Sequence, residues 1–284
     1  PAAKGEVVIG SADFTEIELM ATMYAELLES KGYTPELKVV ANRELYEPAL
    51  ENGDIDVDPD YAATMAEFLN AKVNGPDAAA NAPVASSYPA ATVAAINTLG
   101  NPLGLTALEP AQAVDQNAFA VTQDFATTNK LTTLSDLGAL GQPITLAAVE
   151  ECLTRKFCGG VLQDDYGLTL TEVLPTGFGS VQTKTAVQDG KAQLGLVGST
   201  DATLEDFGLV ILTDDKKVQL ADNLTPVLGA KYAQDAELTA ALNSLSAQLT
   251  TEDLTALIRK VDAERQKAQD VAHQYLVDKG LIPA

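Results

Sequence analysis

Short apolar runs alternate with helical patterns along most of this chain, and this alternation constrains the fold more than any other feature of the sequence. An apolar run at Val7–Ile9 precedes apolar residues at helical spacing over 17–28, and a second run, "LKVV", precedes another helical pattern. Asp13 with Glu16 predicts the start of the first helix, and Gly32 predicts its end. Strands that alternate with helices in this way indicate an α/β fold.

The same pattern indicates two lobes that are interleaved in the sequence. Residues 71–85, rich in Ala, Asn and Pro, predict a loop, and two strand patterns after it predict a passage from one lobe to the other. We therefore expect residues 1–110 and 214–284 to form the first lobe and residues 111–213 to form the second. Each lobe is expected to hold a mainly parallel sheet flanked by helices.

The charge of the chain excludes one class of partner. It has 40 acidic and 18 basic residues, and the basic residues are scattered, so we expect no nucleic acid partner. No apolar run approaches the roughly 18 residues of a membrane-spanning helix. The chain begins at Pro1 without a leader, as a mature form would, so we expect any signal segment to lie outside it.

The two cysteines lie close together in "ECLTRKFCGG", at Cys152 and Cys158. This spacing allows a local disulfide, which would place the protein outside the cytoplasm, but it also allows two free thiols. Since His273 is the only histidine, the chain has too few soft ligands for a zinc site, and we expect no metal and no cofactor. His273 is expected to have a surface or helix-packing role.

Four aspartates alternate in "DIDVDPDY", at Asp54, Asp56, Asp58 and Asp60, so a strand there would direct them to one face. Their order does not match an EF-hand calcium loop. Burying four carboxylates together is costly, and we therefore expect a short strand whose end is exposed at the rim of the lobe. Tyr61 directly follows this strand and opens the next helical pattern.

A Gly-x-Gly turn in "TGFGSVQTK" precedes another helical pattern. Such a turn can hold an anion at a helix N-terminus, but this one lacks the third glycine of a dinucleotide-binding fingerprint. A purely structural turn is an adequate explanation.

Four motifs in this order resemble the osmoprotectant-binding proteins: "GSADFTE", "NRELYEPALENGDIDVDPDYAAT", "ECLTRKFCGGVLQDDYGL" and "STDATLEDFGLVILTDDKK". These are extracytoplasmic substrate-binding components of ABC importers for glycine betaine, choline and related solutes, and the sequence looks most like their actinobacterial branch. The resemblance implies a two-lobed periplasmic-binding-protein type II clamshell that holds its ligand between the lobes and docks on a membrane permease. It further implies a monomer without catalysis, anchored to the membrane as a lipoprotein.

The resemblance also assigns roles to individual residues. Tyr61 matches an aromatic residue of the cage around the ligand's ammonium group, and Thr64 matches a residue that bonds the ligand's carboxylate. Phe119 occupies a second cage position, without a hydroxyl, and Asn117 occupies a polar position near the ammonium. Arg155 matches an arginine that binds the ligand's carboxylate, for which a guanidinium is well shaped.

Three positions depart from the family pattern. Gly198 and Asp222 stand where relatives carry cage tyrosines, and Ala12 stands where some relatives carry a lysine. Two hypotheses therefore remain open. Either the charge of Asp222 attracts the ligand's ammonium group and so compensates for the missing cage tyrosines, or the pocket accepts a different, bulkier solute. An enzyme on the same fold, with Asp222, Asp13 or Tyr61 as acid or base, is a less favoured alternative. The candidate ligand-binding residues are Ser11, Ala12, Asp13, Tyr61, Thr64, Asn117, Phe119, Arg155, Gly198, Asp222 and Asn223.

Overall fold

The computed structural model describes residues 4–12, 14–40 and 43–283, which form two compact units. The first unit contains Pro1–Val114 and Ala221–Ala284, and the second contains Asp115–Leu220. The chain therefore passes between the units twice, and each unit has its own sheet. Within the described residues, no helix is long and apolar enough to cross a membrane.

The sheet of the first unit contains five strands among the described residues. In sheet order these are β2 (Thr34–Val39), β1 (Glu6–Ser11), β3 (Val57–Tyr61), β10 (Leu224–Leu228) and β4 (Thr106–Ala107). β1 pairs in parallel with β2 and β3, whereas β10 pairs antiparallel with β3 and β4. Because β10 begins opposite the end of β3, the chain returns from the second unit at the carboxyl end of that strand. The sheet is thus mixed rather than mainly parallel.

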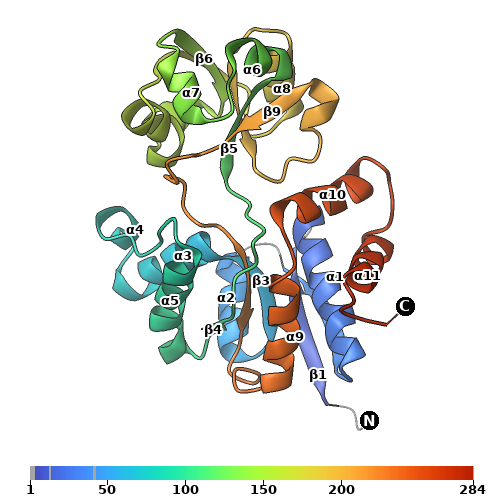
Figure 1. Cartoon of the computed structure of the whole chain (residues 1–284). Helices are drawn as coiled ribbons and strands as arrows, with labels where there is room; N and C mark the ends of the chain where they lie inside the picture. Colours follow the sequence, from blue (N-terminus) through green and yellow to red (C-terminus); the bar gives the residue numbers. More distant parts are fainter. Residues whose placement is uncertain (1–3, 13, 41–42, 284) are drawn as a thin grey trace. The chain divides into compact units, whose positions relative to one another are not determined.

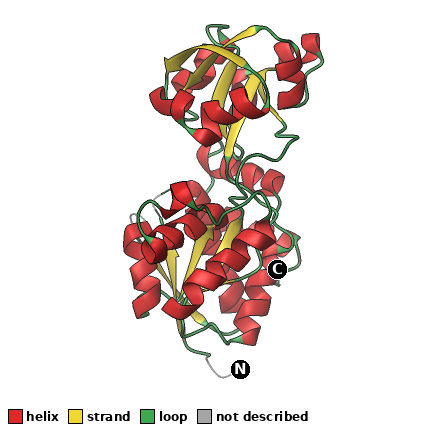
Figure 2. Cartoon of the chain, turned by 90° about the vertical axis from the view of Figure 1, so that its left-hand side faces the viewer, coloured by secondary structure: helices red, strands yellow, loops and turns green. Residues whose placement is uncertain are grey.

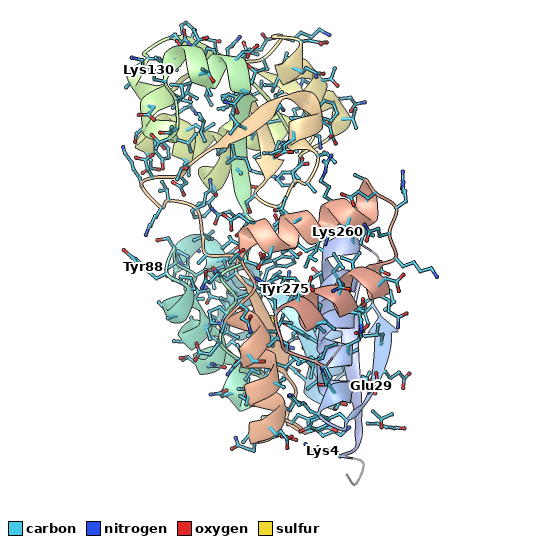
Figure 3. The ribbon with its side chains drawn as sticks, turned by 45° about the vertical axis from the view of Figure 1, so that its right-hand side comes forward. Lys4, Glu29, Tyr88, Lys130, Lys260 and Tyr275 are labelled. Atoms are coloured by element: carbon cyan, nitrogen blue, oxygen red, sulfur yellow. A yellow bond between two sulfur atoms is a disulfide. The ribbon has the colours of Figure 1, made fainter. Side chains whose placement is uncertain are left out.

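Helices cover both faces of this sheet. The helices of the first unit are α1 (Thr15–Ser30), α2 (Arg43–Asn52), α3 (Ala62–Asn74), α4 (Ala78–Asn81), α5 (Pro89–Gly100), α9 (Ala236–Ser246), α10 (Thr251–Asp262) and α11 (Ala268–Asp278). Figure 1 shows α1, α9, α10 and α11 on one side of the sheet, and α3 and α5 on the other. The buried Tyr275 of α11, labelled in Figure 3, bonds Asp253 of α10 with its hydroxyl and so joins two of these helices.

The second unit repeats the same arrangement of strands. Its sheet order is β7 (Thr169–Pro175), β6 (Pro143–Ala148), β8 (Leu194–Gly198), β5 (Asn117–Thr122) and β9 (Leu209–Leu212). β6 pairs in parallel with β7 and β8, and β5 pairs antiparallel with β8 and β9. Figure 2 shows helices on both faces of the sheet; among them are α6 (Gln123–Asn129), α7 (Leu134–Ala139) and α8 (Val181–Gln188).

Several segments differ from the sequence-based prediction. The predicted loop at 71–85 contains the end of α3 and all of α4, and α5 and α6 were not predicted. In α5 only Thr92, Ile96 and Gly100 are buried, so its alanine-rich sequence gives a weak amphipathic pattern. Residues 214–220 belong with the second unit, where Asp214 accepts a hydrogen bond from the hydroxyl of Tyr166.

Candidate functional site

A cavity of about 330 Å³ opens in the first unit, at the ends of β1 and β3. Ser11 ends β1 and Tyr61 ends β3, and the two strands run in parallel, so both residues reach the same edge of the sheet. In open α/β sheets this carboxyl edge is the usual place for a ligand. The lining residues are Ser11, Ala12, Phe14, Ile17, Arg43, Glu44, Tyr46, Asp58, Pro59, Tyr61 and Thr64.

The cavity brings together four of the predicted site residues, Ser11, Ala12, Tyr61 and Thr64. A fifth, Asp222, is tied to the cavity through Thr64. Asp13 lies outside the described residues.

Three aromatic rings face this cavity, from Phe14, Tyr46 and Tyr61. The hydroxyl of Tyr61 donates a 2.5 Å hydrogen bond to the buried carboxylate of Glu16, which fixes the ring at the start of α3. The Arg43 guanidinium lies 5.7 Å from the centre of the Tyr46 ring. Phe14 is 50% exposed, although it is a large apolar side chain. Exposed aromatic faces of this kind attract organic cations.

The acidic end of β3 is buried, contrary to the prediction that it would be exposed at a rim. Asp56, Asp58 and Asp60 are all buried. The main-chain N–H of Val8 donates to Asp56, and the side chain of Arg43 donates to both oxygens of Asp60. Positive and polar partners therefore offset the cost of burial for two of the three carboxylates.

Asp222 closes the N-terminal end of α3. Its two carboxylate oxygens accept hydrogen bonds from Thr64, at 2.8 Å from the main-chain nitrogen and 2.6 Å from the hydroxyl. Burial raises the pKa of Asp222, and the two bonds from Thr64 oppose this rise. The neighbouring Asn223 is buried, and its side-chain amide donates a hydrogen bond to the main-chain carbonyl of Ala111. Its side chain therefore links two chain segments and does not line the cavity.

The remaining predicted residues lie in the second unit. Asn117 and Gly198 are paired across β5 and β8, and the Asn117 side chain donates a 3.0 Å hydrogen bond to the carbonyl of Phe157. Arg155 is exposed between two short helical segments, Glu150–Thr154 and Lys156–Asp165.

Phe119 does not occupy a cage position. Its side chain is 1% exposed and lies in the hydrophobic core of the second unit, with Leu146 and the two cysteines. Phe119 follows Asn117 by two residues, so both side chains lie on the same face of β5. At Phe119 this face is already covered by the hydrophobic core. We therefore correct the predicted role of Phe119 to core packing.

Another aromatic residue lies beside Gly198. A Cβ atom built on Gly198 would lie 3.5 Å from the ring of Phe178, whose side chain is 49% exposed. The ring thus occupies space next to the position where the resemblance implied a cage tyrosine. Phe178 belongs to the Gly-x-Gly turn, and no local sequence pattern indicates that this turn approaches β8.

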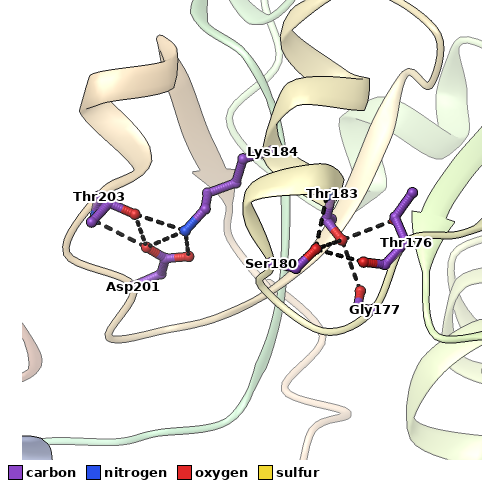
Figure 4. Close-up of polar contacts among 7 residues, drawn as sticks. All are labelled: Thr176, Gly177, Ser180, Thr183, Lys184, Asp201 and Thr203. Carbon is purple, nitrogen blue, oxygen red and sulfur yellow. Dashed lines mark hydrogen bonds and ion pairs between the residues drawn. The ribbon is translucent and has the colours of Figure 1, made fainter.

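Internal hydrogen bonds fix that turn. The buried hydroxyl of Thr183 donates to the carbonyl of Gly177, and Ser180 caps α8 by accepting from the main-chain N–H of Thr183 (Figure 4). Figure 4 also shows Lys184 bonded to Asp201 and Thr203, which ties α8 to the segment after β8. These bonds explain the turn as a structural element, because its polar side chains already have partners.

The two cysteines form a disulfide. Cys152 and Cys158 are both buried in the core of the second unit, against residues of β5 and β6. The disulfide that the spacing allowed is confirmed, and the alternative of two free thiols is excluded. Among the described residues, no group of His, Cys, Asp and Glu side chains is arranged to hold a metal ion.

Comparison with known proteins assigns a family. A family model described as "Substrate binding domain of ABC-type glycine betaine transport system" matches residues 5–278. This chain belongs to that family. The resemblance found in the sequence motifs is therefore confirmed, and substrate-binding proteins of this family act outside the cytoplasm as parts of importers.

Individual members of the family cover nearly the whole chain. A glycine-betaine-binding protein of Pseudomonas aeruginosa is 26% identical, over 96% of this chain and 88% of its own length. The glycine betaine-binding protein YehZ of Escherichia coli is 28% identical, over 98% of this chain and 92% of its own. The solved structure of apo YehZ has a TM-score of 0.80 and covers 97% of this chain and 99% of that chain. The fold of this substrate-binding protein is thus the two-lobed type II fold.

Sequence reasoning missed five residues of this substrate-binding protein that carry chemistry at the candidate site. Phe14, Arg43, Tyr46 and Asp58 line the cavity, and Phe178 lies beside Gly198. Phe14 follows the motif "GSAD" directly, so its place at the end of β1 was a usable signal. The position of Phe178 depends on a contact between two elements distant in sequence, which no local pattern reveals.

Proposed function

We propose that this chain captures a small quaternary-ammonium solute outside the cytoplasm and delivers it to an ABC permease. The observation that carries this proposal is the cavity of the first unit, where the rings of Phe14, Tyr46 and Tyr61 adjoin buried carboxylates. A quaternary ammonium donates no strong hydrogen bond, so proteins hold it with aromatic faces and negative charge. In this proposal Tyr61 is the central cage residue.

The proposed contribution of the second unit comes from three residues. Asn117 contributes a side-chain amide near the start of β5 and Phe178 contributes an aromatic face, whereas the exposed Arg155 already interacts within the chain and is proposed only to border the site. Members of the type II fold commonly close about a hinge when ligand binds. The two crossings of the chain, near residues 114 and 220, are the proposed hinge.

We further propose that capture occurs without catalysis, by a monomer that is anchored as a lipoprotein. No histidine or cysteine is among the described residues that line the cavity. The cysteines are joined to each other, and His273 lies on α11 against Glu26, so neither residue type offers a nucleophile or base there. The monomeric state and the lipid anchor remain predictions.

A thermal-shift screen followed by calorimetry tests the proposal. The solutes are glycine betaine, choline, carnitine, proline betaine, ectoine and a set of amino acids, and a ligand that binds the folded state raises the melting temperature. We expect a shift with at least one quaternary ammonium compound. A shift only with another, bulkier solute would replace the proposed ligand class, and turnover of any solute would overturn the absence of catalysis.

A pair of tyrosine variants localises the site. Since one aromatic contact to a cation contributes roughly 0.5–2 kcal/mol, Tyr61→Ala should weaken binding by about 2- to 30-fold. Tyr88→Ala is the matched control, because Tyr88 is 69% exposed, does not line the cavity and projects from the surface (Figure 3). Equal effects of the two changes would contradict a site at Tyr61.

A further inference from the structure

The carboxyl group of Asp58 lines the cavity without a partner. Its residue is only 3% exposed, and no described residue donates a hydrogen bond to it. The carboxyl group lies directly over Gly10, where an added Cβ atom would be 1.8 Å from its Oδ1 atom. A buried, unpaired carboxylate is costly unless an opposite charge joins it. The cavity is the side from which such a charge can come.

The positively charged side chain at the cavity, Arg43, is already paired with a carboxylate of the protein. Arg43 is the only base among the described residues that line it, and its guanidinium donates to both oxygens of Asp60. Asp60 accepts a third hydrogen bond, at 2.7 Å, from the main-chain N–H of Tyr61. Arg43 is therefore neutralised by Asp60 and offers little to a carboxylate on the ligand.

The two hydrogen-bond donors of Thr64 also have a partner within the protein. The resemblance assigned Thr64 to a ligand's carboxylate, but the carboxylate of Asp222 occupies both its main-chain N–H and its hydroxyl. A zwitterionic ligand would place a further negative charge beside Asp58, Asp222 and Glu44. The first unit thus offers an unpaired carboxylate to a cation and no free charged donor to an anion.

We propose that Asp58 is the counter-ion of the bound ammonium group, and that it favours ligands with a net positive charge, such as choline, over zwitterions such as glycine betaine. The proposal rests on the proposed capture of a quaternary ammonium and adds the charge class of its ligand. Asp58 acts through charge rather than through a hydrogen bond, since a quaternary ammonium has no proton to donate. The aromatic rings and this carboxylate together form the cation site.

Ligand capture should then release a proton. Burial, together with the charge of Asp60, raises the pKa of Asp58 well above its usual range, and Arg43 opposes this rise only in part. A bound cation favours the ionised carboxylate, so it lowers that pKa and expels the proton that Asp58 held. Among the described residues, the other titratable groups around Asp58 or the cavity are Glu16, Tyr24, Arg43, Glu44, Tyr46, Asp60, Tyr61 and Asp222.

Isothermal titration calorimetry in paired buffers of different ionisation enthalpy measures this release. Choline and glycine betaine are titrated into the wild-type chain at several values between about pH 5 and pH 8. We expect choline to bind more tightly as the pH rises, by up to about tenfold per pH unit, with release of up to about one proton per ligand. Choline should bind at least about tenfold more tightly than glycine betaine at the upper end of this range.

Two aspartate variants test whether the proton released on choline binding comes from Asp58. Asp58→Asn should abolish the proton release and reduce the preference for choline, whereas Asp54→Asn, an exposed change in the same acidic stretch, should leave both unchanged. Choline binding without proton release, or tighter binding of glycine betaine, would overturn the role of Asp58 while leaving quaternary-ammonium capture intact. If neither solute nor any other quaternary ammonium binds the wild-type chain, the proposed function itself fails and this inference fails with it.

Discussion

The burial of Asp58 has a consequence for stability that can be measured without any ligand. Because the folded chain raises the pKa of Asp58, its protonated form stabilises the fold, and this contribution is lost as the pH rises through the raised pKa. Asp58→Asn removes the titration. We expect the variant to exceed the wild type in free energy of unfolding by about 1–3 kcal/mol near pH 8.

This difference should shrink toward zero below about pH 3, under the ordinary aspartate pKa, where the wild-type carboxyl group is protonated in both the folded and the unfolded state. Urea unfolding of both proteins at several pH values measures it, with Asp54→Asn as the exposed control. A variant that is no more stable than the wild type at the higher pH would mean that Asp58 has a partner in solution.

Phe178 allows a second prediction for a single residue. Its ring is half exposed, so Phe178→Ala should change the melting temperature of the empty protein little. We expect the same change to weaken quaternary-ammonium binding by about 2- to 30-fold, because it removes one aromatic face. Calorimetry measures the loss, and Val181→Ala, a change at a more exposed apolar residue just beyond the same turn, is the control.

The candidate site was only partly predictable at the level of residues. Ser11 and Tyr61 follow from their positions at strand ends, and Thr64 follows from its place in the first turn of the helix after β3. The burial of Asp58 was not predictable, because an aspartate-rich strand normally indicates exposure to solvent, and only the absence of a side chain at Gly10 leaves room for its carboxyl group. The inward direction of Phe119 depends on packing against other elements of the second unit.

At the scale of elements, the disulfide joins two neighbouring helical segments that are short and irregular. Cys152 lies in the segment Glu150–Thr154 and Cys158 in the segment Lys156–Asp165, which has non-helical dihedral angles at Phe157. Arg155 lies between the two cysteines, on the loop that they close. A cross-link over so short a loop contributes about 2 kcal/mol in the chain-entropy model.

Replacing both cysteines by serine should therefore lower the free energy of unfolding by about 2 kcal/mol or more, since two buried core positions also change. Hydrogen exchange should show the loss of protection in the second unit, around β5 and β6, rather than in the first. Equal loss of protection in both units would contradict separate cores. Reduction of the wild-type disulfide gives the same comparison without a change of sequence.

Most elements were predictable because their apolar spacing is strong, as in α1, where apolar residues recur at helical spacing from Ile17 to Leu28 and are buried. Those that were missed lack such a signal. α5 is rich in alanine and α6 is short, so neither shows a clear period. The antiparallel direction of β10 was also hidden, since it follows from where the chain returns and not from the sequence of the strand.

At the scale of the whole molecule, two units joined by two chain crossings favour a ligand-dependent hinge. Near one crossing, the bridge between Val114 and Asn223 and the bond from Ala113 to the carbonyl of Leu249 anchor the chain within the first unit. The movement is therefore expected in the few residues beyond these anchors. A ligand shifts such a hinge only as far as it binds one arrangement more tightly than the other.

We accordingly expect the radius of gyration to fall when a saturating quaternary ammonium ligand is added, as measured by small-angle X-ray scattering. Tyr61→Ala, measured at a ligand concentration that saturates only the wild type, should show a smaller change because fewer molecules are occupied. A solute that does not bind should leave both proteins unchanged. Unaltered scattering at a concentration where calorimetry shows full occupancy would mean that capture needs no closure, and that the first-unit cavity with Asp58 holds the ligand by itself.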